Sequence, residues 1–177
     1  KDNIERAINK SEMALDGNYE NIRYEGFGPF NVAFIIESLT NNTNRTASSI
    51  RTTLQKSGGR LGESGSTKHL FFSCGVIKIS KEKISDEKIL EIAIDAGAKD
   101  CFSSSNFHEI ICEKEDFYKV KSNVEKKISE FIYSGIEWRP FNKLSVSVEQ
   151  GEKINQILES LDDNDDVQNI FTNYIVK

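Results

Sequence analysis

Three arginines and a lysine stand among small polar residues between positions 41 and 68. They are Arg45, Arg51, Arg60 and Lys68, and the polar residues around them are Asn41, Asn42, Asn44, Thr46, Thr52 and Ser64. Arginine binds phosphate through paired hydrogen bonds, and nearby hydroxyls and amides can hold a sugar–phosphate backbone without reading its bases. We therefore predict that Arg45, Arg51, Arg60 and Lys68 contact nucleic acid. An ordinary solvated helix face is the competing interpretation.

The overall charge of the chain limits how it can hold a phosphate backbone. The 23 basic and 28 acidic side chains give a formal net charge of −5. Neutralised phosphates supply most of the free energy of non-specific binding, so proteins that bind nucleic acid alone usually carry a basic surplus. Any contact must therefore come from a local patch or from a segment outside these 177 residues.

Residues arranged for catalysis are sparse. His69 and His108 each stand beside an apolar or aromatic residue on an expected strand, where a lone histidine is more often structural. The chain has no GxSxG, P-loop or HExxH motif. The glycine-rich segment 58–66 lacks the Gly-Lys-Ser/Thr ending of a phosphate cradle and follows a helix, so we read it as a loop. We predict no catalytic residue, no cofactor and no enzymatic activity.

The cysteines and the acidic run do not form a metal site. Cys74, Cys101 and Cys112 show no CxxC spacing and are expected to be reduced thiols of a cytoplasmic protein. The acidic run at 162–166 lacks the glycine and the final acidic residue of a calcium-binding EF-hand loop. No apolar run approaches the roughly 20 residues needed to span a bilayer, so we expect no membrane partner.

A helix is expected to position the first two arginines. We predict that Asn44 caps it, that it runs to about Ser57, and that Gly58-Gly59 provides a left-handed exit. Its expected buried stripe consists of Ala47, Ile50 and Leu54. Arg51 lies off this stripe, so its guanidinium should reach solvent.

The remaining pattern predicts two α/β units. In the first, strands are expected at 21–27, 32–39 and 68–73. The second has an expected strand at 76–79, a helix capped by Ser85, a hairpin of strands 99–102 and 107–112, a helix at 116–133 and a strand at 136–139. This order is the ferredoxin-like βαββαβ unit. A helix at 150–161 and a strand at 167–175 remain, and they would complete the first sheet.

We therefore predict an α+β fold with two ferredoxin-like α/β-sandwich domains, the second inserted into the first. The first domain should comprise residues 17–74 together with 144–177, and the inserted domain residues 75–143. Residues 1–16 read as the end of a helix that belongs to an upstream domain.

Short glycine-containing segments occur along the chain in a definite order. They are Tyr24–Pro29, Asn44–Thr46, Gly58-Gly59, Leu61-Gly62, Ser64–Ser66, Gly75–Ile77, Ala96–Ala98 and Asp163–Gln168. Together they resemble the YebC/PmpR family over essentially the whole chain. Two positions depart from the family pattern. Phe30-Asn31 stands where Gly-Gly is usual, and Arg60 stands where Asn is frequent.

The resemblance implies a non-enzymatic regulator of gene expression that binds DNA. Relatives include the mitochondrial translational activator of cytochrome c oxidase, and some members act on the ribosome, so ribosomal RNA is the alternative partner. The family has a basic helical N-terminal domain before two α/β domains, and residues 1–16 would be its remnant. From another class, the inserted unit could be a small-ligand sensor similar to ACT domains.

Overall fold

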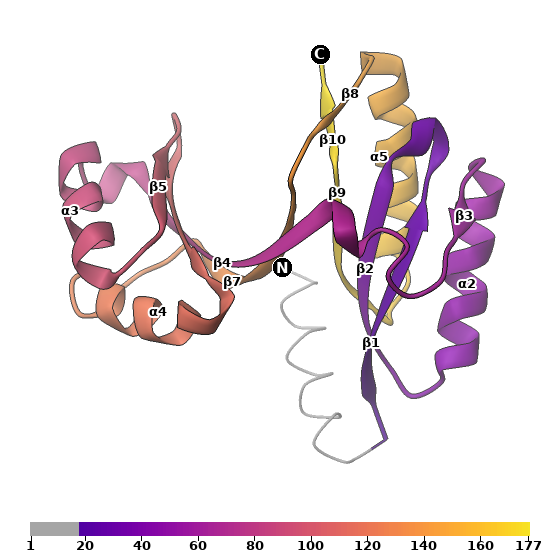
Figure 1. Cartoon of the computed structure of the whole chain (residues 1–177), viewed down its shortest axis with the longest axis horizontal. Coiled ribbons are helices and arrows are strands. Elements are labelled where there is room, and N and C mark those ends of the chain that lie inside the picture. The colour runs from indigo at the N-terminus through magenta and orange to yellow at the C-terminus, as the bar shows by residue number, and fades with distance from the viewer. Residues whose placement is uncertain (1–17) are drawn as a thin grey trace. The chain divides into compact units, whose positions relative to one another are not determined.

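The computed structural model describes residues 18–177, which form two compact units (Figure 1). The smaller unit is Ser73–Arg139, and the larger comprises the described residues before it, 18–72, together with Pro140–Lys177. The sequence placed these boundaries two to four residues later, at 74/75 and 143/144. Both units combine mainly antiparallel sheets with helices, which confirms the α+β class. The helix expected near the start of the chain lies outside the described residues.

The larger unit is built on a four-stranded sheet with the order β3-β1-β2-β9. Its strands are β1 (Glu20–Phe27), β2 (Ala33–Thr40), β3 (Arg60–Leu61) and β9 (Val167–Thr172). Helices α2 (Thr43–Lys56) and α5 (Val148–Asp162) pack against one face, where Phe34 and Ile36 of the sheet meet Ile50, Leu54 and Ile154 of the helices. Apolar residues at helical spacing on both helices produce this core.

One expected strand of the larger unit is two strands. The chain breaks at Asn173, and β10 (Tyr174–Val176) leaves β9 to pair in parallel with β8 (Leu144–Val146), which the sequence did not predict. The Asn173 side chain accepts a hydrogen bond from Ala33 N at 2.9 Å, and its carbonyl accepts one from Leu144 N at 2.6 Å. These bonds hold the chain out of the β9 ladder, so the prediction of a single strand at 167–175 is wrong.

The smaller unit has the sheet order β5-β6-β4-β7, the arrangement of a ferredoxin-like fold. Its strands are β4 (Phe71–Ser80), β5 (Asp100–Ser103), β6 (Phe107–Glu113) and β7 (Tyr133–Pro140). Helices α3 (Asp86–Ala96) and α4 (Phe117–Glu125) cover one face, over a core that includes Ile77, Ile79, Ile89, Ile110, Val120 and Val124. Ser85 caps α3 and Gly97 ends it in the left-handed conformation, as the sequence predicted.

Two elements of the smaller unit differ from expectation. β4 is one continuous strand that contains residues 71–73 and 76–79, so the expected break between two strands and the expected start at 68 are wrong. Helix α4 ends at Glu125, not near Tyr133. The chain beyond it still places Ile128 and Phe131 against the core, but Ile132 N donates to Lys78 O at 2.8 Å. That amide belongs to the approach to β7 and cannot also be part of a helix.

Short 3₁₀ turns connect several strands and helices. They are η1 (Pro29–Asn31), η2 (Lys68–Leu70), η3 (Lys81–Lys83) and η4 (Lys114–Asp116). In η1, Phe30 and Asn31 both have positive φ, at 62° and 60°. These are the two positions where glycines are usual in the YebC/PmpR pattern, so here two larger residues adopt a conformation that favours glycine.

Candidate nucleic-acid interface

Helix α2 carries two of the four predicted contacts. Its N-cap is Asn42, whose side chain accepts a hydrogen bond from Arg45 N at 3.0 Å, so the prediction of Asn44 as the cap is wrong by two residues. Thr46, not Ala47, is the first buried residue of its stripe. A polar residue can be buried there because its hydroxyl is satisfied, lying 2.8 Å from both Thr40 Oγ1 and Asp166 Oδ2.

Arg45 forms hydrogen bonds and an ion pair with other residues of the protein. Its Nη2 donates to Asp166 Oδ2 at 2.9 Å and to Asn41 Oδ1 at 3.1 Å. Asp166 is buried and also accepts the Thr46 hydroxyl, so this carboxylate joins the start of α2 to the turn before β9. Although about half of the Arg45 side chain is exposed, its charge is largely balanced by Asp166.

The surroundings of Arg45 are acidic. A hollow of about 380 Å³ beside it is lined by Arg45, Ser49, Ser160, Asp163, Asn164 and Asp166. Two carboxylates next to one guanidinium disfavour a phosphate at this place. The first turn of α2 is therefore a poor anion site, although the sequence predicted Arg45 as a contact.

The other three predicted residues are exposed. Arg51 lies six residues after Arg45 on α2, about 9 Å along the helix axis. Arg60 lies in β3 opposite Phe27, and its guanidinium carbon stands 5.0 Å from the centre of the Phe27 ring. Lys68 begins η2, and its backbone N–H donates to Glu25. The fold thus brings Arg60 and Lys68 to the end of β1, whereas Arg45 and Arg51 are spaced along α2.

Glu25 organises the loop that leads to Lys68, and sequence reasoning missed it. Its carboxylate is buried and accepts hydrogen bonds from the backbone N–H groups of Gly65, Thr67 and Lys68 at 2.7, 3.1 and 2.6 Å. The Thr67 hydroxyl lies 3.2 Å away, and Arg23 Nε lies 3.5 Å away. Burial alone would raise the pKa of Glu25, but these hydrogen bonds outweigh it and hold the pKa below its usual value.

The converging N–H groups form a concavity of the kind that binds phosphate in other proteins. Here the carboxylate of Glu25 occupies it. The glycine-rich segment is therefore a rigid loop and not a phosphate cradle. The sequence did contain one indication of this role. Glu25 is a charged residue inside the Tyr24–Pro29 segment, on which the family resemblance partly rests.

Glycines bring this loop close to β1. A side chain at Gly26 would place its Cβ 2.7 Å from Arg60 O and 2.9 Å from a methyl carbon of Leu54. Gly58 leaves α2 with φ at 83°, which confirms the expected left-handed exit. The close approach at Gly26 fixes Arg60 against β1, whereas Gly58 serves through its positive φ.

The two histidines have different surroundings. His108 is fully buried, and its ring nitrogens lie 2.9 Å from Ile84 O and 2.7 Å from Ser103 Oγ, so its role is structural. His69 lies in η2 and not on the expected strand. It borders a hollow of about 460 Å³ in the larger unit that is lined by His69, Leu70, Phe141, Asn142, Lys143, Leu144 and Asn173.

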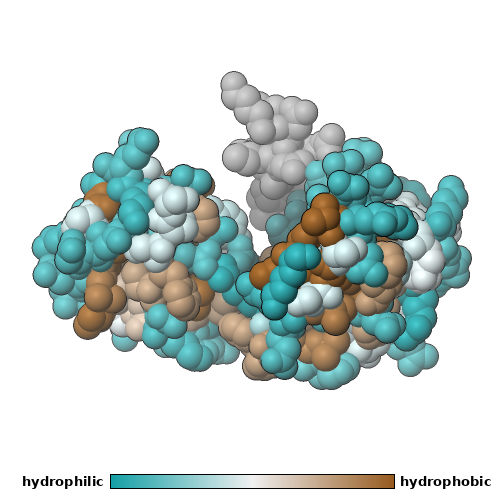
Figure 2. All heavy atoms as spheres, turned by 90° about the horizontal axis from the view of Figure 1, so that it is seen from above, coloured by the Kyte–Doolittle hydropathy of each residue, from teal (hydrophilic) through white to brown (hydrophobic). Residues whose placement is uncertain are grey.

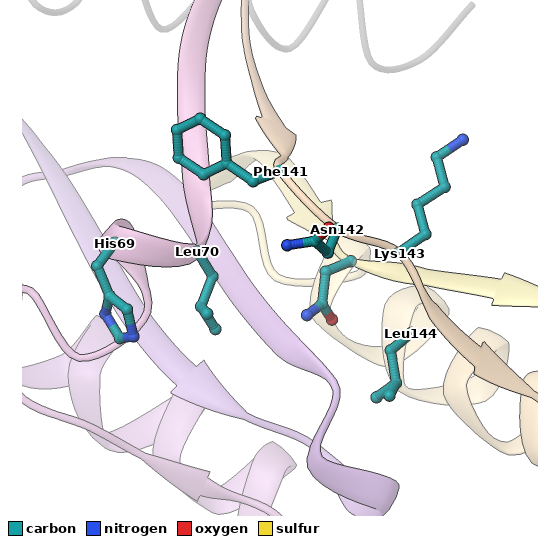
Figure 3. Close-up of a pocket in the computed structure, with 7 residues that line it drawn as sticks. His69, Leu70, Phe141, Asn142, Lys143 and Leu144 are labelled. Atoms are coloured by element: carbon teal, nitrogen blue, oxygen red, sulfur yellow. The ribbon is translucent and has the colours of Figure 1, made fainter.

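The lining of that hollow does not indicate catalysis. Figure 3 shows Asn142 pointing toward Leu70 and Lys143 extending away from the other labelled side chains. No carboxylate or thiol lies among the lining residues to pair with His69 as an acid, base or nucleophile. Hydrophobic atoms are also visible on the face of the larger unit in Figure 2. Exposed apolar residues of this unit on β8, α5 and β10 are Leu144, Val148, Ile175 and Val176.

Residues 18–177 offer neither a metal cluster nor a membrane-spanning helix. Within that range no cluster of three or more His, Cys, Asp or Glu side chains is placed to hold a metal ion. No helix there is long and apolar enough to cross a membrane. The three cysteines are free thiols, and burial raises the pKa of Cys112 to about 11, which makes its thiolate scarce near neutral pH.

Comparison with known proteins identifies the family. The model that describes the second and third domains of TACO1/YebC proteins matches residues 19–174. The chain belongs to the TACO1/YebC family. This confirms the resemblance drawn from the glycine-containing segments, and the match is to a family of regulators and not to a family of enzymes.

Two relatives illustrate the match. A probable transcriptional regulatory protein of Pelagibacter ubique is 52% identical over 173 residues, which cover 98% of this chain and 72% of that protein. The crystal structure of a conserved hypothetical protein from Aquifex aeolicus superposes with a TM-score of 0.83 at 34% identity. That match covers 90% of this chain, which spans only 66% of the length of the solved chain.

Proposed function

We propose that this TACO1/YebC chain is a non-enzymatic regulator of gene expression that contacts the phosphate backbone of DNA. The observation that carries the proposal is that two exposed cations have their backbones near the end of β1, Arg60 opposite Phe27 and Lys68 bonded to Glu25. A cation that is already positioned loses less side-chain entropy when it meets a phosphate.

Arg51 stands apart from this pair on α2, and we assign Arg45 a different role. Arg51, Arg60 and Lys68 are the proposed phosphate contacts. Arg45 is proposed to hold the start of α2 in place through Asp166. Phosphate contacts fix a protein on a duplex but carry no sequence information. We therefore expect weak sequence preference from this part of the protein.

Ribosomal RNA is the second candidate partner. The proposed contacts address phosphates only, and RNA presents the same group. In either case the net charge of −5 predicts modest affinity from this chain alone. The ACT-like ligand sensor remains a third possibility of another class, and it would require a small molecule to bind between paired copies of the smaller unit.

The first prediction tests the phosphate contacts. We expect Arg60→Ala to weaken binding to duplex DNA of any sequence and to lower the slope of log K against log salt by about one unit. Arg51→Ala and Lys68→Ala should behave alike. Fluorescence anisotropy with a labelled duplex over a salt series measures this, and the same series with a double-stranded RNA tests the second candidate.

Lys119→Ala is the matched control because Lys119 is an exposed cation on α4 in the smaller unit. It should leave the slope unchanged. If Arg60→Ala, Arg51→Ala and Lys68→Ala all leave the slope unchanged, the proposed contacts are wrong. A loss of preference for one sequence at constant slope would indicate base reading instead.

A further inference from the structure

The sheet of the smaller unit has two faces of different character. One face packs Ile77, Ile79 and Ile110 against α3 and α4. On the other face Lys78 of β4 and Phe102 of β5 both stand opposite Glu109 of β6. Residues that stand opposite one another in an antiparallel pair share a face, and so do residues two apart on one strand. Phe107 therefore lies on this second face as well.

Two aromatic rings flank one lysine there, and a third ring, that of Phe102, lies two strands away on β5. Lys78 Nζ is 5.1 Å from the centre of the Phe107 ring and 5.9 Å from that of Tyr133, which begins β7. The Phe102 side chain is 54% exposed and Tyr133 is 38% exposed, while Phe107 is half-buried. Phe102 and Phe107 occupy diagonal positions on neighbouring strands, about 7–8 Å apart. We call Phe102, Phe107 and Tyr133, with Lys78, the aromatic face.

The charges between the rings are balanced. Glu109 accepts from Arg139 at 2.6 Å and pairs with Lys78 at 3.6 Å, and Arg139 also pairs with Glu137 at 3.0 Å. Two cations thus meet two carboxylates. The next pair along the same face, Val76 and Ile111, is buried. The network fixes the surface without leaving a surplus charge of either sign, so a ligand must be attracted mainly by the rings.

The spacing of the rings selects the kind of ligand. A protein partner would favour one continuous apolar area, whereas these rings are separated by ion pairs. Separate exposed rings on a rigid sheet suit flat aromatic ligands, each of which stacks on one ring. In cells unpaired bases are presented mainly by the loops, bulges and ends of RNA.

We propose that the aromatic face binds unpaired bases of single-stranded RNA by stacking. This rests on the proposed function only in that the chain is associated with nucleic acid, because it uses different residues and a different kind of contact. Arg51, Arg60 and Lys68 would hold phosphates through charge, and Phe102 and Tyr133 would hold bases through their ring faces.

The test measures binding of the 177-residue chain to a fluorescein-labelled single-stranded RNA of mixed sequence, roughly 10 nucleotides long. Phe102→Ala and Tyr133→Ala should each weaken binding about 5- to 100-fold, with the salt slope unchanged. Phe102→Trp should restore or strengthen it, since tryptophan also stacks. Tyr118→Ala is the matched control, because Tyr118 is 76% exposed on α4, which packs on the opposite face of the sheet.

Every outcome decides the matter. Unchanged RNA affinity in both Phe102→Ala and Tyr133→Ala would overturn the proposal, and so would an equal loss in Tyr118→Ala. Stronger binding to single-stranded DNA of the same sequence would overturn the choice of RNA. If gel filtration shows a dimer that Phe102→Ala dissociates, the aromatic face is an interface between copies. Failure of the phosphate contacts would appear separately, as an unchanged salt slope in Arg60→Ala.

Discussion

Glu25 in the larger unit and Glu109 in the smaller unit are both carboxylates withdrawn from water, but different groups stabilise them. Backbone N–H groups of a loop surround Glu25. Side-chain cations surround Glu109, namely Arg139 and Lys78. Burial would raise the pKa of both carboxyls, and in both cases the surrounding donors and charges lower it instead.

The difference decides what each region can offer a ligand. Most of the donors to Glu25 are backbone N–H groups of the loop, and exposed cations, Arg60 and Lys68, stand on either side of that loop. Around Glu109 the cations Arg139 and Lys78 form ion pairs with carboxylates. The groups that remain to bind a ligand are aromatic rings. One carboxylate thus supports a charged surface, and the other supports an aromatic one.

The largest expected effect comes from removing Glu25. Glu25→Ala would leave three backbone N–H groups without their acceptor. An unsatisfied buried polar group costs about 1–3 kcal/mol, so we expect a loss of about 3 kcal/mol or more in the free energy of unfolding. Denaturant unfolding measures it. Glu20→Ala, at an exposed position on the same strand, should cost less than about 0.5 kcal/mol. An equal cost for the two variants would refute the role of Glu25.

A smaller effect is expected at Glu109. Glu109→Gln keeps the size of the side chain but removes the charge that Arg139 and Lys78 meet, and it should cost about 1–3 kcal/mol. A double-mutant cycle with Arg139→Gln should give a coupling of about 1 kcal/mol. Additive losses would mean that the two side chains do not stabilise one another, and the contrast with Glu25 would lose its basis.

The smallest effect is a pH dependence of the Glu25 site. Because the pKa of Glu25 is lower in the folded than in the unfolded chain, its contribution to stability is complete above its ordinary value of 4.5. The contribution is lost as the pH falls from there through the lower folded pKa. Unfolding midpoints between neutral pH and this acidic range should therefore fall more steeply for the natural chain than for Glu25→Gln. Parallel curves would show that Glu25 is not stabilised as a carboxylate.

Much of the fold could be predicted because its signals are local. Ser85 caps α3 as predicted and Gly97 ends it, since caps act within a few residues of the chain. Helix α4 was predicted too long because an apolar stripe continues past its end. Ile128 and Phe131 face the same core without being helical, and periodicity alone cannot distinguish these cases.

The candidate site was predicted only in part. The sequence pointed to exposed cations near α2, and Arg51, Arg60 and Lys68 are exposed. It could not reveal that Arg45 pairs with Asp166, which lies 121 residues away in the chain. The aromatic face was missed because Phe102, Phe107 and Tyr133 come from three strands, and their shared position depends on register.

By itself the sequence determined the α+β class, most of the helices and strands, and membership of the TACO1/YebC family. The tertiary structure alone decided which polar groups meet. It placed Glu25 inside the glycine-rich loop, gave Arg45 a structural partner, and separated β10 from β9 at Asn173. The physical reason is the range of the interactions. Caps, turns and apolar periodicity act between residues close in the chain, whereas buried hydrogen bonds and ion pairs join residues that only the complete fold brings together.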